Sequence, residues 1–327
     1  MKNGKKIVLE PVIRRFVDAL NAKGGKPLYT LSPQDARQVL LDAQKEALDP
    51  TELYTDIQTR DMTLPAGPAK QTEIRLYRPE NTAGLKIPVV LYIHGGGWVL
   101  GDKTTHDRMV RRIAHKVRCA VIFVNYTPAP EAQYPVQLEQ CYGVFEYLLA
   151  HEDEFAVNTS RIAVAGDSVG GDMSAALTLM ANRNHPGRIC FQALLYPVTD
   201  ADFDTPSYLE FAEGPWLTRE AMKWFWDNYA PDKARRKEVT ASPLLAEIEE
   251  LRGLPPALVI TDANDVLRDE GEAYAEKLMQ ADVPVTAVRY LGAMHDFMML
   301  NAVSKSHAAD AAMKQTCRAL KRALHRS

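Results

Sequence analysis

The feature that most constrains this chain is the pentapeptide Gly-Asp-Ser-Val-Gly at residues 166–170. The apolar run 161–165 before it is typical of a buried strand, and residues 171–177 after it are typical of the start of a helix. A chain that passes directly from a strand into a helix makes an abrupt turn at the serine. This turn strains the serine backbone, and the flanking glycines leave room for it. The pattern therefore predicts that Ser168 exposes its hydroxyl at the carboxyl edge of a sheet, beside the amino end of a helix.

From residue 87 onward, apolar segments of strand length alternate with segments of helical periodicity. Continuous apolar runs are typical of parallel strands that are buried on both faces. The alternation predicts an α/β fold, in which a mostly parallel, doubly wound sheet is flanked by helices. The expected strands lie at residues 88–93, 119–124, 161–165, 190–196, 257–260 and 285–288, and the expected helices at 102–117, 136–150, 169 onward, 268–280 and 304–324.

Two regions differ from this alternation. The first fifty or so residues are amphipathic and predict helices at 11–20 and from 32 to about 48, and strands at 55–64 and 72–78 follow. Residues 199–242, between two expected strands, have no strand pattern but many aromatic side chains. Such an insertion is as consistent with a small satellite core as with a lid over a binding site.

Composition excludes several classes of protein. The chain of 327 residues is 46% hydrophobic and 25% charged, and its net charge of -3 gives no reason to expect nucleic acid as a partner. Charges interrupt the apolar runs of residues 1–20, and no apolar stretch is as long as a membrane span, so we expect a cytoplasmic protein with no membrane partner. The four scattered cysteines predict free thiols, with neither a zinc site nor a disulfide framework.

A serine needs a histidine as a base, and an acid that orients this histidine, before it can act as a nucleophile. Where the serine lies on a turn of this kind, the acid and then the histidine follow it in the chain, each after a strand. His295 lies in a glycine-containing loop directly after the last expected strand, whereas His307 and His325 fall within the terminal helix pattern. His295 is therefore the predicted base for Ser168.

Three aspartates follow the expected strand 257–260 and are candidates for the acid. Asp269 opens the next helix, where its carboxylate is better explained as an N-cap or first-turn charge that stabilises the helix N-terminus. Asp262 adjoins the strand, and Asp265 lies further into the loop, followed by two apolar residues that can anchor it. Spacing alone favours Asp265 and leaves Asp262 as the alternative.

A glycine-rich segment, His-Gly-Gly-Gly-Trp at residues 94–98, follows the expected strand 88–93. Glycines let backbone N–H groups approach a substrate closely, and acyl transfer needs such donors for the oxyanion. Nucleotide-binding patterns fail here, because Leu100 and Asp102 stand where two phosphate-loop motifs require glycine and lysine. We therefore expect no nucleotide cofactor, and the chemistry of a serine nucleophile needs no metal.

Together these segments resemble the bacterial hormone-sensitive-lipase-like esterase family of α/β-hydrolases. The resemblance is carried by residues 94–98, 166–171, 265–271 and 295–297. It implies the α/β-hydrolase fold and places the acid on Asp265. It also implies an N-terminal helical cap segment at 1–50, a catalytic domain at 51–198 and 243–327, and a cap insertion at 199–242.

The resemblance further implies roles for the residues around the serine. The oxyanion donors would be the N–H groups of Gly96, Gly97 and Val169, and His94 with Gly95 would support the glycine loop through hydrogen bonds. The candidates for the substrate pocket are Trp98, Trp216 and Asp167. The family more often has alanine at position 169 and proline at 266, so the branched side chain of Val169 is expected to narrow the space beside the oxyanion.

The predicted function is hydrolysis of carboxylic esters with short or medium acyl chains, through a Ser-His-Asp triad and an acyl-enzyme. The expected partner is a small-molecule ester, and the resemblance allows a homodimer through the edge of the last strand. One alternative is an amidase or peptidase with the same triad. Another is a non-catalytic ligand receptor on the same fold, which the presence of His295 disfavours.

Overall fold

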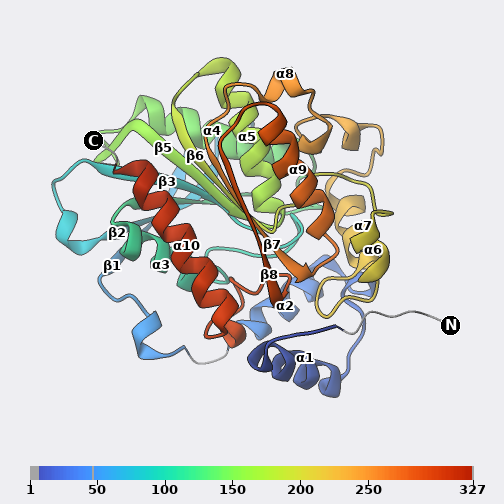
Figure 1. Cartoon of the computed structure of the whole chain (residues 1–327). Coiled ribbons are helices and arrows are strands. Elements are labelled where there is room, and N and C mark those ends of the chain that lie inside the picture. Colours follow the sequence, from blue (N-terminus) through green and yellow to red (C-terminus); the bar gives the residue numbers. More distant parts are fainter. Residues whose placement is uncertain (1–6, 46–47, 326–327) are drawn as a thin grey trace.

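The computed structural model describes residues 7–45 and 48–325 and consists of one twisted sheet between layers of helices (Figure 1). Within these residues, the strands are β1 (Ile57–Leu64), β2 (Thr72–Pro79), β3 (Ile87–Ile93), β4 (Ala120–Asn125), β5 (Val157–Asp167), β6 (Ile189–Leu195), β7 (Ala257–Asn264) and β8 (Val285–Met294). They form a single sheet in the order β1-β2-β4-β3-β5-β6-β7-β8. β2 pairs antiparallel with β1 and β4, and every other pairing is parallel, which confirms the predicted doubly wound sheet.

Helices cover both faces of this sheet. The α-helices of the described residues are α1 (Pro11–Lys23), α2 (Pro33–Ala43), α3 (Asp107–Val117), α4 (Val136–Ala150), α5 (Val169–Asn184), α6 (Pro206–Glu210), α7 (Arg219–Tyr229), α8 (Ile248–Leu251), α9 (Arg268–Gln280) and α10 (His307–Leu324). α3 and α10 pack together on one face, and α4, α5 and α9 pack on the other. Figure 1 shows α1 and α2 near the carboxyl ends of β7 and β8, which is the edge where the site residues were predicted.

The helix predicted to run from residue 32 to about 48 ends earlier, at Ala43. The next residue, Gln44, binds a distant loop: its Oε1 accepts the N–H of Asn301 at 2.8 Å, and its carbonyl oxygen accepts the side-chain amide of Asn301 at 2.9 Å. These bonds hold Gln44 against that loop, and the second of them satisfies a backbone carbonyl at the end of the helix. Residues 46 and 47 of the prediction lie outside the described residues.

The helix predicted from residue 102 begins later, at Asp107. The side chain of Asp102 accepts the N–H groups of Thr104 and Thr105, each at 2.8 Å, and so closes a local turn in place of the first helical turn. The last strand, predicted at 285–288, continues as β8 to Met294. The longer strand brings the chain directly to His295.

The apolar side chains of the strands and of the flanking helix faces form the core. A large cluster surrounds the centre of the sheet, and a smaller one lies between α8, α9 and β7. The four cysteines are free thiols, and three of them are buried, as predicted from their apolar surroundings. Among the described helices, none combines the length and the apolar character that crossing a membrane requires.

The turn between β5 and α5 holds Ser168 in a strained backbone conformation, with φ 54° and ψ -122°. The glycines around it are required by close packing. A Cβ on Gly166 would lie 2.1 Å from the carbonyl oxygen of Gly170, and a Cβ on Gly170 would lie 2.0 Å from that of Ile93. Because Ile93 ends β3, the first turn of α5 is pressed against the neighbouring strand.

This contact generates a test of the fold. We expect Gly170→Ala to lower the free energy of unfolding by about 3 kcal/mol or more, because the carbonyl of Ile93 is fixed in the sheet and has no room to move. Gly271→Ala is the matched control, since Gly271 is also helical but would meet the Thr261 methyl group at 3.2 Å, a side-chain atom that can shift. The control should change stability by less than about 1 kcal/mol. Urea unfolding followed by circular dichroism measures both, and equal losses would contradict the packing argument.

Candidate active site

Three of the predicted residues meet at the carboxyl edge of the sheet. Ser168 lies between β5 and α5, Asp265 follows β7, and His295 follows β8. The ring of His295 lies between the other two, with Nε2 2.9 Å from the Oγ of Ser168 and Nδ1 2.7 Å from the Oδ2 of Asp265. All three side chains are buried, so this path of hydrogen bonds is largely shielded from bulk water.

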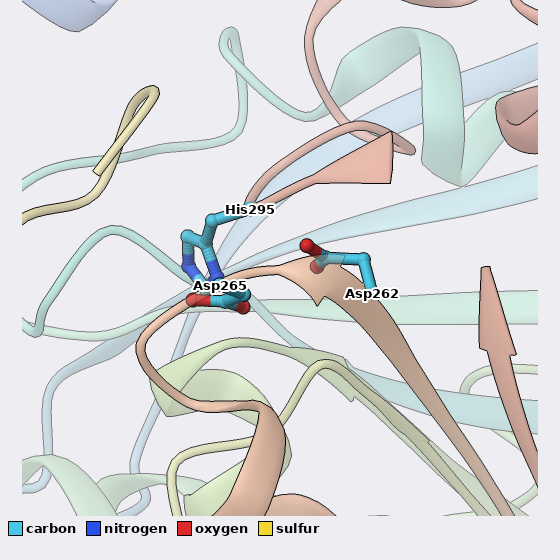
Figure 2. A group of neighbouring side chains, drawn as sticks. All are labelled: Asp262, Asp265 and His295. Carbon is cyan, nitrogen blue, oxygen red and sulfur yellow. The ribbon is translucent and has the colours of Figure 1, made fainter. Parts of the chain in front are cut away.

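The three candidate aspartates lie in different environments. The Oδ2 of Asp265 binds the ring of His295, and its Oδ1 accepts the N–H of Leu267 at 3.1 Å. The carboxyl of Asp262 lies beside this pair but forms no hydrogen bond to His295 (Figure 2). Asp269 faces elsewhere, and its Oδ2 accepts the N–H of Ser207 at 2.8 Å. The geometry therefore favours Asp265, the residue preferred from the sequence, as the partner of His295.

The electrostatic surroundings of His295 favour its protonated form. Burial lowers the pKa of His295, but the carboxyl groups of Asp265 and Asp296 more than offset this effect, so the pKa is raised above the ordinary value of 6.5. Asp296 places Oδ1 3.5 Å from the Nε2 of His295, and its Oδ2 accepts the indole N–H of Trp216 at 2.8 Å. An imidazole in this setting readily accepts the proton that Ser168 must release.

Ser168 and His295 open into a cavity of about 640 Å³. Its walls come from three parts of the chain: the N-terminal helical region, the glycine loop, and the insertion around α7. The apolar and aromatic residues among them are Leu20, Pro27, Leu28, Tyr29, Leu31, Val39, Leu40, Leu100, Trp216, Leu217, Ala221, Met222 and Phe225. A mostly apolar cavity of this size, with a few polar groups at one point, is typical of a site for a small organic molecule.

Trp216 lines this cavity, but Trp98 does not, which corrects the prediction for Trp98. The Trp98 side chain is fully buried, with its ring stacked on Tyr229 at 4.0 Å and in edge contact with Trp226 at 4.7 Å. Both partners belong to α7, so Trp98 fastens the end of the glycine loop to the insertion. The side chain of Val169 is buried and is not among the cavity-lining residues.

Asp167 likewise does not line the cavity, and its side chain is buried between the sheet and the glycine loop. Its Oδ1 accepts the hydroxyl of Tyr92 at 2.6 Å and the N–H of Gly95 at 3.1 Å, and its Oδ2 lies 3.2 Å from the Nε2 of His106. Burial raises the pKa of Asp167, but His106, the hydroxyl of Tyr92 and His94 together lower it more, so the net shift is downward and favours an ion pair with His106. Asp167 therefore ties the glycine loop to the sheet.

The glycine loop lies over the serine. Gly96 and Gly97 line the cavity, and in the described ranges neither their N–H groups nor that of Val169 donate a hydrogen bond to the protein. His94 Nδ1 lies 2.8 Å from the carbonyl oxygen of Gly95, and its ring stacks on Tyr126 at 4.1 Å. Burial and the nearby His106 lower the pKa of His94 to about 3, so this ring is neutral.

Two features of the site were missed from the sequence. Asp296 directly follows the predicted base, and this adjacency was a signal that a second carboxyl lies close to the imidazole. Phe225 lies against the glycine loop, where a Cβ on Gly97 would meet its ring at 2.1 Å. Phe225 belongs to the aromatic insertion, but the insertion's many aromatic residues gave no means of selecting it.

Asp262, Asp265 and His295 are the one group of described residues whose ligand atoms are spaced for a metal ion, all within 4.8 Å of one another. Both ring nitrogens of His295 are already engaged, one by Ser168 and one by Asp265. A metal ion would have to displace one of these bonds. The arrangement therefore fits proton transfer from the serine better than metal ligation.

The sheet order, the strained serine and the residues bonded to it define an α/β hydrolase. A family model described as alpha/beta hydrolase fold matches residues 90–299, and the chain belongs to this family, which confirms the resemblance noted in the sequence. The carboxylic ester hydrolase LipN of Mycobacterium tuberculosis is 37% identical over 92% of this chain and 80% of its own length. The ethyl acetate hydrolase of Pseudomonas putida is 30% identical over 90% of this chain and 93% of its own. The crystal structure of a thermostable esterase from Pseudomonas putida is 44% identical, with a TM-score of 0.94 over 99% of this chain and 100% of that one.

The position of Asp167 yields a second test. Asp167→Ala leaves the buried His106 without its partner and the N–H of Gly95 without an acceptor, and should cost about 3–5 kcal/mol of stability. The control is Asp204→Ala, which removes the partner of Arg219 at a side chain 73% exposed and should cost less than about 1 kcal/mol. Urea unfolding separates the two cases. A loss for Asp167→Ala no larger than that of the control would show that the buried network contributes little.

Proposed function

We propose that this protein is a serine carboxylesterase that hydrolyses esters with short or medium acyl chains through an acyl-enzyme. The observation that carries the proposal is the unbroken path of hydrogen bonds from Ser168 through His295 to Asp265, at the floor of an apolar cavity. The relatives named above are esterases or ester hydrolases, and their similarity extends over 90% or more of this chain, which supports the same activity here.

In this mechanism Ser168 attacks the ester carbonyl carbon while His295 takes the hydroxyl proton on Nε2. Asp265 holds the ring through Nδ1 and stabilises the imidazolium that forms. The C–O bond to the alcohol then breaks, and His295 gives its proton to the departing alkoxide. A water molecule then attacks the acyl carbon and gives one proton to His295. The bond between that carbon and the Oγ of Ser168 breaks, and His295 returns the proton to Oγ, which releases the acid and restores Ser168.

The tetrahedral intermediate of each step carries a negative oxygen, and the glycine loop is suited to bind it. The N–H groups of Gly96, Gly97 and Val169 act as the donors in our proposal, because no protein acceptor in the described residues occupies them. Preorganised donors of this kind are each worth about 3 kcal/mol in the transition state. Asp167 keeps the loop in place by accepting the N–H of Gly95.

We further propose that the N-terminal helices and the insertion 199–242 act together as a cap over the acyl site. Both contribute apolar walls to the cavity, and they contact one another where Phe16 meets Trp216, with ring centroids 5.5 Å apart. The side chain of Arg37 anchors α2 to the catalytic core, through Nε to the carbonyl of Val99 at 2.8 Å and through its contacts with Glu131. A cavity of about 640 Å³ is of a size that suits a short or medium acyl chain.

The predicted homodimer and cytoplasmic location stay predictions. β8 pairs with β7 at the end of the sheet order, and a strand in that position offers backbone groups to a second strand. Light scattering of the purified protein measures the molar mass and decides between a monomer and a dimer. Fractionation of cells that express the full chain decides its location.

The first functional test replaces the nucleophile. Ser168→Ala should lower kcat/KM for p-nitrophenyl butyrate by at least about 10⁴-fold, with unchanged circular dichroism, because no other group then forms the acyl-enzyme. The exposed Ser160→Ala is the control and should keep full activity. Across acetate, butyrate, octanoate and palmitate esters, kcat/KM should be highest for the shorter chains. Full activity of Ser168→Ala would overturn the assignment, and faster cleavage of matched amides than of esters would favour the amidase.

The second functional test concerns the acid. In the wild type, activity should fall on acidification as His295 binds a proton, at a pH above the 6.5 of an ordinary imidazole, because its pKa is raised. Asp265→Asn should lower kcat about 10⁴-fold. It should also move the acidic limb of the pH–activity profile to lower pH, since the variant lacks the carboxylate that stabilises the imidazolium. Asp269→Asn is the control, because Asp269 binds Ser207 instead of His295. A limb that stays in place in Asp265→Asn would assign the role to another carboxyl.

A further inference from the structure

Asp262 lies at the carboxyl end of β7 and has no part in the mechanism above. Its side chain is fully buried, and neither carboxyl oxygen has a hydrogen-bond partner among the described residues when the group is ionised. A buried carboxylate without partners is costly, by several kcal/mol in typical proteins. A residue in such a position needs either a cation or a proton, and its neighbours decide which of the two it has.

The groups that face Asp262 are mostly acidic. On the loop after β7 lies Asp265, on the loop after β8 lie His295 and Asp296, and Tyr196 follows β6. Only His295 among them can carry positive charge, and its ring nitrogens are bonded to Asp265 and Ser168. Burial, followed by the carboxylate of Asp265, raises the pKa of Asp262 well above its ordinary value. The neighbours therefore favour a proton on Asp262 over ionisation.

The position of the side chain shows where this proton can go. Figure 2 shows the carboxyl of Asp262 turned toward Asp265 and His295, and ligand atoms of the three residues lie within 4.8 Å of one another. A carboxylate has about four lone-pair sites. Asp265 uses two of them, for His295 and for the N–H of Leu267, and so retains the capacity to accept a bond from Asp262.

We propose that Asp262 keeps its proton at neutral pH and donates it in a hydrogen bond to the carboxylate of Asp265, which makes Asp262 a positioning residue for the triad. This inference rests on the triad of the proposed function. The bond holds the Asp265 carboxylate against the ring of His295 and spreads its negative charge. The pair of aspartates then carries one negative charge instead of two. The imidazolium form of His295 is therefore less strongly stabilised and loses its proton more easily.

Two variants separate the hydrogen bond from the charge. Asp262→Asn keeps the shape and replaces the O–H donor with an N–H donor, and it alters no charge if Asp262 is neutral. The acidic limb of the plot of kcat/KM against pH should therefore stay within about 0.3 pH units of its position in the wild type. Asp262→Leu removes the donor, concentrates charge on Asp265, and should move the limb upward by about one pH unit and lower kcat/KM about tenfold. Recovery of most of that loss in Asp262→Asn identifies the donated bond as the cause.

Asp172→Asn is the matched control for both measurements. Asp172 is fully buried and burial raises its pKa, as for Asp262, but it is not among the groups that act on His295. This control should leave the acidic limb in place. A downward shift of the limb in Asp262→Asn would overturn the proposal, because it would mean that a negative charge had been removed from beside His295. Wild-type kinetics in Asp262→Leu would overturn it as well, because the bond would then have no effect.

Infrared difference spectra supply a readout that does not depend on turnover. The wild type at neutral pH should show a protonated carboxyl C=O band that Asp262→Asn abolishes, and Asp172→Asn should abolish a different band. Loss of a carboxylate band instead of a carboxylic acid band in Asp262→Asn would overturn the proposal. Failure of the esterase assignment would appear separately, as an active Ser168→Ala variant with the carboxylic acid band of Asp262 still present.

Discussion

The contact between the first turn of α5 and the end of β3 is the constraint on which the rest of the site depends. Gly170 lies so close to the carbonyl of Ile93 that any side chain would collide with it, and the sharp turn that leads into this contact has Ser168 at a positive φ of 54°. Ser168 consequently stands above the middle of the sheet, between β3 and β6. The glycine loop on one side and the loops after β7 and β8 on the other reach it only because parallel strands end at the same edge.

Two aspartate–histidine pairs lie at this edge, and their surroundings give them different work. Asp167 and His106 are fully buried, away from the cavity, and their bonds hold the glycine loop in place. Asp265 and His295 lie where the histidine also meets Ser168 and the cavity. The Asp167–His106 pair therefore has a structural role, whereas the Asp265–His295 pair can accept a proton, because only the second pair lies beside a group that can react, the hydroxyl of Ser168.

The sequence predicted the sheet and the meeting of Ser168, Asp265 and His295, because each of these residues follows an apolar strand and the strands are parallel. It did not predict where side chains point within loops. Trp98 and Asp167 were expected in the pocket, but Trp98 has a positive φ of 59° and packs on α7, and Asp167 binds Gly95 and His106. Such directions depend on contacts between segments far apart in the chain, which a single sequence does not reveal.

The surroundings of His295 set a limit on how many charges the site can hold. Asp262, Asp265 and Asp296 all lie close to this one imidazole and are shielded from water. If all three were ionised, they would hold His295 in its protonated form, and it could not act as a base at neutral pH. Burial raises the pKa of Asp262 well above its ordinary value and also raises the pKa of Asp296, so burial opposes the ionisation of both groups. A proton on Asp262 therefore removes one of the charges that would hold His295 in its protonated form, and Asp265 remains the carboxylate that is bonded to the base.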